Sequence, residues 1–166
     1  MSRGFVKEED QEEVPLVPPR ADLPDNTDNL VTLNGYEELL LEKEELLKEL
    51  HSLDPSNEKE YRIHSNYLNA KLSLLHERIN SAKIIDPKKL PENQVNFGSV
   101  VTVYNEKLKQ EQTFQIVGVD EAKITKGKIS FITPLAKILL QRKLGEQVTL
   151  KIGSNETTFK IIKISN

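Results

Sequence analysis

Apolar residues in positions 32–53 recur at spacings of three and four, which is the period of one face of an α-helix. The positions of this seam, one of them a lysine, are Tyr36, Leu39, Lys43, Leu46, Leu50 and Leu53. A second seam repeats every seventh residue through Tyr61, Leu68, Leu75 and Ala82, with Ser65, Leu72 and Ile79 between them. Two matched seams joined by a short break predict an antiparallel helical hairpin, an intramolecular coiled coil over residues 32–86.

The break between the seams is the stretch "DPSNEKEY", residues 54–61. Pro55 disfavours the helical conformation for Asp54, so the first helix ends there and a second begins near Ser56 or Asn57. The tip of the hairpin is therefore expected near 54–60. At the other end, Thr32 or Asn34 can cap the first helix, and Glu37 is correctly spaced to complete a capping box with Asn34.

From Asp86 onward the pattern changes to short alternating runs punctuated by glycine and proline. These runs predict strands near 99–104, 112–117, 128–131, 147–152 and 157–164. The segment "PLAKILLQRK", 134–143, predicts one amphipathic helix with Thr133 as its cap and Pro134 in its first turn. The expected fold class is α+β: the hairpin, then a small twisted antiparallel sheet covered by one helix.

The predicted organisation has four parts. Residues 1–31 form an acidic, proline-rich tail that is expected to be irregular, although "EEVPLVPP" is apolar enough to dock as an edge strand. Residues 32–86 form the hairpin, 87–96 a linker, and 97–166 the C-terminal domain.

Composition narrows the classes of function. Charged residues make up 30% of the chain and hydrophobic ones 37%, which suits an elongated helical part better than one compact core. Cysteine is absent and no stretch is apolar enough to span a membrane, so a protein of the cytoplasm is expected. Acidic residues predominate before residue 87 and basic ones after it, which argues against coating of DNA and favours a partner with charged patches.

Catalysis by the chain alone is not expected. His51, His64 and His76 all fall in the hairpin and do not converge as metal ligands, and the glycines form no phosphate-binding loop. The acidic tip has two interpretations. Asp54, Glu58 and Glu60 could present carboxylates to a metal ion, or they could serve only to cap a helix and complement its dipole.

Four C-terminal stretches resemble the bacterial Gre transcript-cleavage factors: "FGSVVTVYN", "FQIVGVDEAK", "GKISFITPLAKILL" and "KLGEQVTLKI". The hairpin sequences "GYEELLLEKEELLKEL" and "ERINSAKIID" resemble the two helices of the same family. The resemblance implies an FKBP-like C-terminal domain that binds RNA polymerase at the rim of its secondary channel. It places the polymerase contact at Ser130, Thr133, Pro134, Leu135, Ala136 and Lys137.

The resemblance also implies that the coiled coil enters the channel as a monomeric accessory factor, not as an enzyme. There Asp54, Glu58 and Glu60 would reach the Mg²⁺ of the polymerase active site, with indirect contact to nascent RNA or DNA and no stably bound cofactor of the factor itself. The family tip usually reads D-L-S-E-N-A-E-Y, so Asn57 stands where the family has a glutamate. The hairpin also lacks something like 15 residues, on the order of 10 Å of reach over two arms.

Three functions therefore remain open, beside the general alternative of a coiled-coil adaptor protein. The first is rescue of backtracked polymerase by stimulating RNA cleavage. The second is binding to the same channel without cleavage, as in the Rnk regulators and the inhibitory Gre homologues. The third is peptidyl-prolyl isomerisation, which would need a pocket lined by aromatic side chains.

Overall fold

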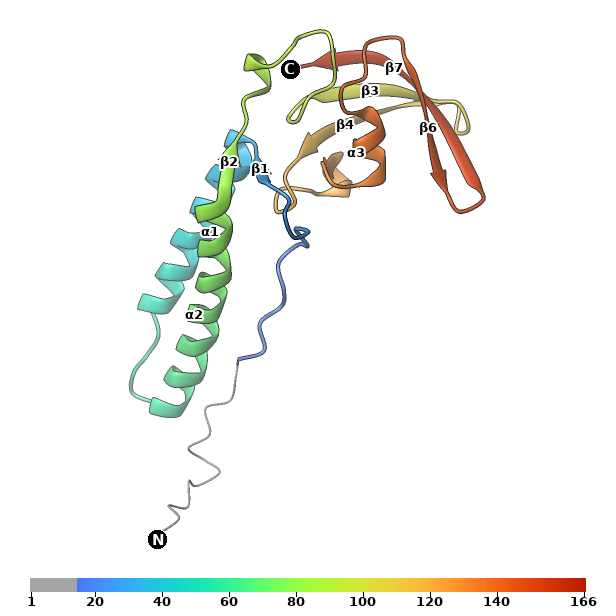
Figure 1. The fold of residues 1–166 in the computed structure, drawn as a ribbon. Coiled ribbons are helices and arrows are strands. Elements are labelled where there is room, and N and C mark those ends of the chain that lie inside the picture. Colours follow the sequence, from blue (N-terminus) through green and yellow to red (C-terminus); the bar gives the residue numbers. More distant parts are fainter. Residues whose placement is uncertain (1–14) are drawn as a thin grey trace.

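The structure is a computed structural model, and it describes residues 15–166. A long helical hairpin projects from a C-terminal sheet domain, and the turn of the hairpin is the end farthest from that domain (Figure 1). This arrangement is the α+β architecture that the sequence predicts. Among the described residues, no helix is long and apolar enough to cross a membrane.

The hairpin consists of α1 (Leu33–His51) and α2 (Glu58–Ser81), which run antiparallel. Its core is made by the leucines of the two seams: Leu39, Leu46, Leu68, Leu72 and Leu75. Packing weakens toward the turn, where the predicted seam residue Tyr61 is 39% exposed. The leucine period thus yields the predicted helices, with a core of buried leucines that ends before the turn.

The start of α1 corrects one prediction. Thr32 is the cap residue, and its Oγ1 accepts a hydrogen bond from the Gly35 backbone N–H at 2.9 Å. Asn34 therefore lies inside the first turn, and the capping box with Glu37 does not form. Instead, the side chain of Asn34 is directed to the C-terminal domain, where it finds a carboxylate partner.

A short parallel pair of strands closes the base of the hairpin. β1 (Asn29–Val31) precedes α1, β2 (Ala82–Ile84) follows α2, and the two pair in register from Asn29 opposite Ala82. The buried Asn29 also donates its Nδ2 to the carbonyl of Arg78 at 2.9 Å. Three-residue strands carry too little periodicity to be recognised in a sequence, so this pair was not predicted.

The C-terminal domain contains β3 (Val100–Asn105), β4 (Gln110–Val117), β5 (Lys128–Ser130), β6 (Gln147–Ile152) and β7 (Asn155–Ser165). All five expected strands are present, in the order β5-β4-β3-β7-β6. The sheet is mixed, not antiparallel throughout, because β5 pairs parallel to β4. The connection between them crosses back over residues 118–127 and includes a 3-10 turn, η3 (Ile124–Lys126), so β5 enters in the same direction as β4.

The helix α3 (Pro134–Leu139) packs beside this sheet and completes the core. It is shorter than the predicted 134–143 because Leu140 takes an extended conformation and Gln141 has a positive φ of 66°. Before the sheet lies a second 3-10 turn, η2 (Pro87–Lys89), in the predicted linker. Ala136 and Leu139 of α3 are fully buried with Val101, Val103, Ile116 and Ile161 of the strands.

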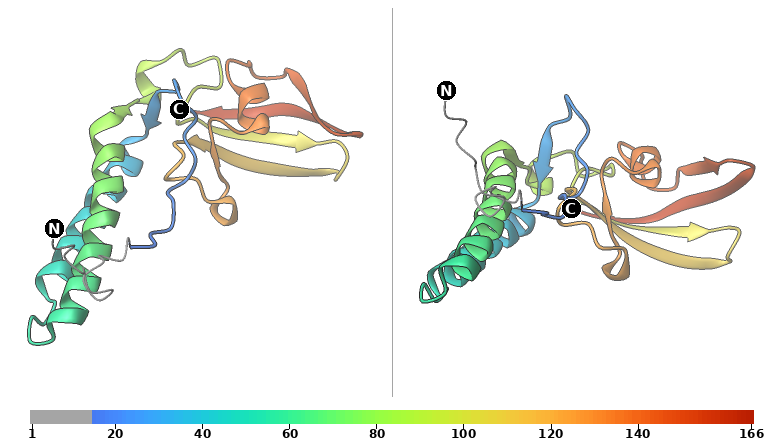
Figure 2. Two further views of the ribbon diagram at one scale, coloured as in Figure 1. Left: turned by 60° about the horizontal axis from the view of Figure 1, so that its bottom comes forward. Right: turned by 90° about the horizontal axis from the view of Figure 1, so that it is seen from below.

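The segment before β1 is irregular from residue 15 to residue 28 apart from a turn near Asp25. The edge strand proposed for "EEVPLVPP" falls partly outside the described residues, and residues 15–19 form no strand. Although it is irregular, this segment runs alongside the body of the molecule in the views of Figures 1 and 2. Specific side-chain contacts hold it there and are described below.

Candidate functional site

The tip of the hairpin is the exposed turn between His51 and Glu58. Asp54 Oδ1 accepts a hydrogen bond from the Ser56 backbone N–H at 2.9 Å, and this bond lowers the pKa of Asp54 below its ordinary value. Asn57 caps α2, since its Oδ1 accepts from the Glu60 backbone N–H at 3.3 Å. Asp54 and Asn57 therefore both have a structural part in forming the turn.

The tip carboxylates Asp54, Glu58 and Glu60 are all exposed, and they come from the turn and the first turn of α2. In residues 15–166 no group of three or more metal-ligating side chains is close enough to hold an ion. Mg²⁺ is commonly bound by one or two carboxylates together with water and substrate phosphates, so the tip has the chemistry to complete a site on another molecule. Their role as ligands remains a prediction.

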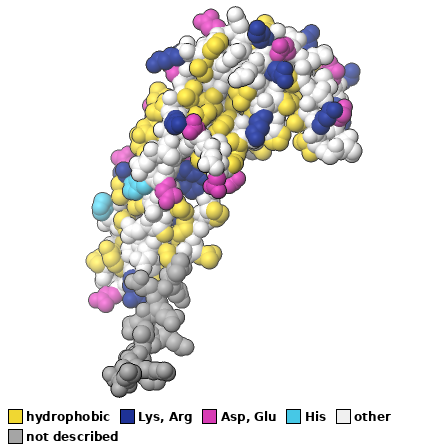
Figure 3. Space-filling view, viewed as in Figure 1, with side chains coloured by type: hydrophobic (Ala, Val, Ile, Leu, Met, Phe, Trp, Pro, Cys, Tyr) yellow, Lys and Arg dark blue, Asp and Glu magenta, His cyan; other side chains and the backbone are white. Residues whose placement is uncertain are grey.

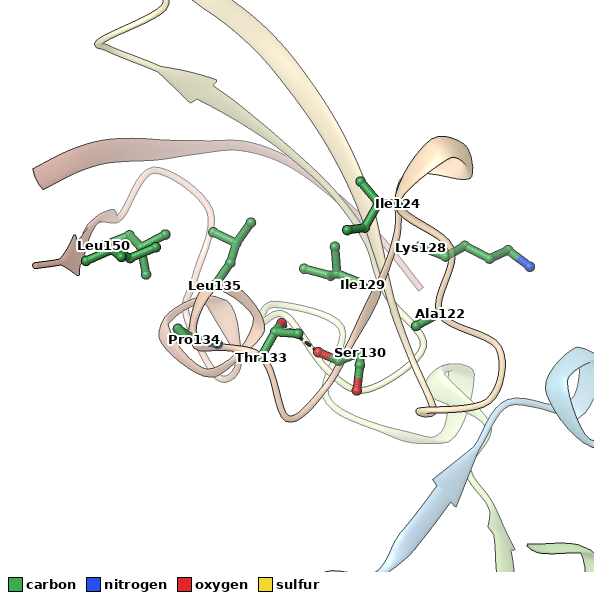
Figure 4. Close-up of a pocket in the computed structure, with 10 residues that line it drawn as sticks. Ala122, Ile124, Lys128, Ile129, Ser130, Thr133, Pro134, Leu135 and Leu150 are labelled. Atoms are coloured by element: carbon green, nitrogen blue, oxygen red, sulfur yellow. Dashed lines mark hydrogen bonds between the residues drawn. The ribbon is translucent and has the colours of Figure 1, made fainter. Parts of the chain in front are cut away.

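A second candidate site is a mainly apolar cavity of about 380 Å³ beside β5 and α3 (Figure 4). It is lined by Ala122, Ile124, Lys128, Ile129, Ser130, Thr133, Pro134, Leu135, Leu150 and Ile152, which are together called the groove. Ile124 is 88% exposed and Ile152 is 61% exposed, unusual values for isoleucines. None of these ten residues is aromatic, which disfavours the proline-isomerase interpretation.

The predicted "TPLA" motif builds one wall of the groove. Thr133 caps α3 by accepting from the Ala136 backbone N–H at 3.4 Å, and its hydroxyl donates to the carbonyl of Ser130 at 2.7 Å. This second bond is drawn in Figure 4. With Pro134 in the first helical turn, the motif fixes where β5 ends and α3 begins. Leu135 is thereby held at the wall of the groove.

Several lysines lie in or next to the segments that line the groove, and one of them, Lys128, is a lining residue. The exposed Lys123 and Lys126 flank Ile124 in sequence, and Lys137 is exposed on α3. In Figure 3 most of the basic side chains visible on this face lie over the C-terminal domain. An apolar groove with a basic rim is suited to an apolar side chain presented by an acidic protein surface.

A buried carboxylate joins this groove to the hairpin. Glu121 Oε1 accepts hydrogen bonds from Lys128 Nζ at 3.0 Å and from Asn34 Nδ2 at 2.9 Å, and Glu121 Oε2 accepts from Thr32 Oγ1 at 2.6 Å. Lys128 lines the groove, whereas Thr32 is the cap of α1. One carboxylate with a 3% exposed side chain therefore connects the groove wall to the first turn of the hairpin.

A family model and individual relatives both match this chain to the same protein family. A family model described as "Transcription elongation factor, GreA/GreB, C-term" matches residues 90–166. Transcription elongation factor GreA of Thermodesulfovibrio yellowstonii is 33% identical over 151 residues, an alignment that covers 81% of this chain and 95% of the relative. This chain belongs to the GreA/GreB family. GreA of Acidiphilium cryptum is 35% identical over 114 residues, with 67% of this chain and 73% of the relative covered.

Solved structures of Gre-family proteins also match. GreA factor homolog 1 (Gfh1) of Thermus thermophilus superposes with a TM-score of 0.40 and 21% identity, covering 84% of this chain and 99% of that one. The GreA/GreB elongation factor of Nitrosomonas europaea gives a TM-score of 0.41 and 20% identity, covering 82% and 98%.

The predicted contact residues of this Gre-family chain fall into two sets. Ser130, Thr133, Pro134 and Leu135 line the groove. Ala136 does not, because it is fully buried in the domain core, and Lys137 does not line it either. Residues that the sequence did not single out are the apolar ones on η3 and β6: Ile124, Leu150 and Ile152. An exposed isoleucine in an otherwise lysine-rich loop, "AKITKGK", is the signal that could have revealed Ile124.

Proposed function

We propose that this Gre-family chain binds bacterial RNA polymerase at the rim of its secondary channel and inserts the hairpin to rescue backtracked complexes. In this proposal the C-terminal domain docks through the groove, and the tip brings Asp54, Glu58 and Glu60 toward the Mg²⁺ of the polymerase. The polymerase performs the cleavage of RNA, and the factor supplies carboxylates in trans as a monomer in the cytoplasm. Contact with nascent RNA or DNA would be made only through the tip.

The observation that carries the proposal is the spatial separation of two unlike surfaces in a chain that matches nearly a whole GreA relative. An apolar groove with a basic rim lies on the C-terminal domain, and exposed carboxylates lie at the far end of a projecting hairpin. A metal shared in trans requires carboxylates that are exposed and ionised. Asp54 is an exposed carboxylate, and the hydrogen bond from Ser56 lowers its pKa further below the neutral range.

A second function, binding without cleavage, is favoured by one observation at the same tip. Asn57 occupies the position of a family glutamate, and its side chain is engaged as the cap of α2. A neutral, hydrogen-bonded amide is a poor substitute for a metal-binding carboxylate. In this alternative the chain occupies the channel and modulates transcription without stimulating cleavage.

The decisive experiment uses a stalled, backtracked elongation complex and measures release of the 3′ RNA fragment. The tip variant Asp54→Ala with Glu58→Ala is compared with the wild type and with a control, Glu37→Gln with Glu77→Gln, which removes two exposed carboxylates near the base of the hairpin. Cleavage by wild type and control but not by the tip variant supports rescue. No cleavage by wild type, with retained competition for the polymerase, supports the second function.

The docking surface is tested by binding. Ile124→Asp places a charge at the rim of the groove on a side chain that is already 88% exposed, so the fold is expected to survive. We expect this change to weaken binding to the polymerase at least tenfold, because an apolar contact is replaced by a desolvated carboxylate. The matched control is Leu108→Asp, at an exposed turn between β3 and β4. Equal affinity of the two variants would contradict docking through the groove.

A further inference from the structure

Residues 15–28, called the strap, lie between the described start of the chain and β1. In Figures 1 and 2 the strap runs down in the angle between the hairpin and the C-terminal domain. The GreA relative of Thermodesulfovibrio yellowstonii aligns with 81% of this chain, which leaves part of the chain without a counterpart in it. The position of the strap raises the question of what it does for the two parts that it borders.

Arg20 is the residue that fastens the strap. Its guanidinium donates to both carboxylate oxygens of Glu42 on α1, at 2.8 and 3.0 Å, and its Nε donates to Asp120 Oδ1 at 3.0 Å. The side chain of Arg20 is only 18% exposed. A single arginine thus binds one carboxylate of the hairpin and one carboxylate of the loop after β4, using the planar fork that suits paired carboxylates.

Arg78, at the end of α2, also contacts Asp120, but at a longer distance than Arg20 does. Arg78 Nε lies 3.7 Å from Asp120 Oδ2, and Arg78 also donates to the carbonyl of Ala21 in the strap. Within the described residues, buried Arg78 Nη1 and Asp120 Oδ2 have no hydrogen-bond partner. Asp120, with a 9% exposed side chain, therefore depends on Arg20 for its close, well-formed bond.

We propose that the strap is a brace that fixes the angle of the hairpin on the C-terminal domain, with Arg20 as its positioning residue. The other hydrogen bonds described between α1 and this domain, from Thr32 and Asn34 to Glu121, lie at the first turn of the helix. Glu42 lies nine residues after Leu33, on the order of 13 Å along the helix axis. A contact at that distance resists bending far better than contacts at the base alone.

The chain contains no cysteine, so two spin labels can be placed without background. We would introduce Ser73→Cys on α2 and Lys160→Cys on β7, both exposed, and measure the distance distribution between them by pulsed electron resonance. With Arg20→Gln we expect the distribution to broaden about twofold, because the hinge at the base is freed. Glu42→Gln removes the negative charge and one of the two acceptor oxygens from the hairpin side, and it should also broaden the distance distribution.

The matched control is Lys83→Gln. It removes an ion pair of 2.7 Å between β2 and Asp28 of the strap, but both side chains are more than half exposed. This variant should leave the distribution unchanged. An unchanged width in both Arg20→Gln and Glu42→Gln, or equal broadening in Lys83→Gln, would overturn the proposal. Circular dichroism confirms in each case that the helices are intact.

The measurement needs no polymerase, so its outcome is independent of the proposed function. A second experiment tests whether the brace affects RNA cleavage, and this experiment rests on the proposed function. If the factor stimulates RNA cleavage, Arg20→Gln should lower cleavage while binding through the groove is retained, because the tip is no longer held in position. Loss of cleavage with an unchanged distance distribution would point to a direct role of Arg20 in the complex and would contradict bracing.

Discussion

Gly35 lies in the first turn of α1, directly against the carboxylate that joins the hairpin to the C-terminal domain. A Cβ added at this position would lie 2.6 Å from Glu121 Oε2 and 3.2 Å from its Cδ. The end of a glutamate side chain can usually move away. Here it is held by Thr32, Asn34 and Lys128, so movement breaks hydrogen bonds. Gly35→Ala therefore tests whether Glu121 is fixed.

Two opposing contributions decide whether Gly35→Ala stabilises or destabilises the protein. Alanine is favoured over glycine in a helix by about 0.5–1 kcal/mol. Against this, displacing Glu121 Oε2 costs the 2.6 Å bond from Thr32, and a hydrogen bond to a charged group contributes about 1.5–3 kcal/mol. The loss exceeds the gain, so we expect Gly35→Ala to destabilise the protein by about 1–2 kcal/mol.

The assay is urea unfolding followed by circular dichroism at the helix band, on wild type, Gly35→Ala, Glu121→Ala and the double variant. With Glu121 shortened to alanine the contacts at 2.6 and 3.2 Å are removed and only the contact of 3.3 Å to the Cβ of residue 121 remains, so Gly35→Ala should then stabilise by at most about 0.5–1 kcal/mol. The change of sign between the two backgrounds is the signature of contact between the two positions. A neutral or stabilising Gly35→Ala in the wild-type background would refute a fixed Glu121.

Two further predictions concern the hairpin. Leu75 is fully buried in the seam between α1 and α2, so Leu75→Ala should reduce the free energy of unfolding by about 2–5 kcal/mol. The control is Leu41→Ala, at a position that is 58% exposed, and it should change the free energy of unfolding little. At the tip, hydrogen bonding from Ser56 lowers the pKa of Asp54, so the turn is stabilised above the unfolded pKa near 4 and loses this contribution as pH falls through the folded value. Carbon-detected NMR titration of the Asp54 carboxyl should give a pKa below that of an unstructured peptide of the same sequence, and an equal value would contradict the hydrogen bond.

The sequence predicted best those elements whose signal is local and repeated. The leucine period of both helices and the alternation of the five strands gave elements of the correct type, with strand ends within a few residues. Pro134 and Thr133 marked the start of α3 correctly, but its end depends on Leu140 and Gln141 leaving the helical conformation. Nothing in the amphipathic pattern of 134–143 indicates that departure.

Long-range pairing was much harder to predict. The parallel entry of β5 depends on how residues 118–127 cross the sheet, and strand period does not specify direction. The contacts of Arg20 join residues 22 and 100 positions apart in the chain. An isolated arginine in a proline-rich tail gives no indication of its partners, so the sequence predicted the irregular conformation of residues 15–28 but not the residues that hold this segment in place.

The residues of the candidate sites likewise fall into those that the sequence indicated and those that only the fold brings together. The carboxylates of the tip were found from sequence because they follow a helix break, and the groove was found only where the "TPLA" motif lines it. Its opposite wall comes from Leu150 and Ile152 on β6, which reach the site through the topology of the sheet. A motif can mark one wall of a cavity, but the fold determines which other residues face it.

In the proposed function, the joint at Glu121 makes the length of the hairpin determine how far the tip reaches from the groove. Lys128 in the groove and Thr32 at the start of α1 share this carboxylate, and Arg20 braces α1 further along. If a partner docks in the groove, the position of the tip then follows from the number of residues in the arms, at about 1.5 Å each. Metal–oxygen bonds to Mg²⁺ are about 2.0–2.1 Å, so the deficit of about two helical turns that the family resemblance implies would not be recovered by side-chain rotation. In the cleavage assay, inserting one seven-residue repeat into each arm should therefore increase fragment release only if reach, and not the chemistry of Asn57, is limiting.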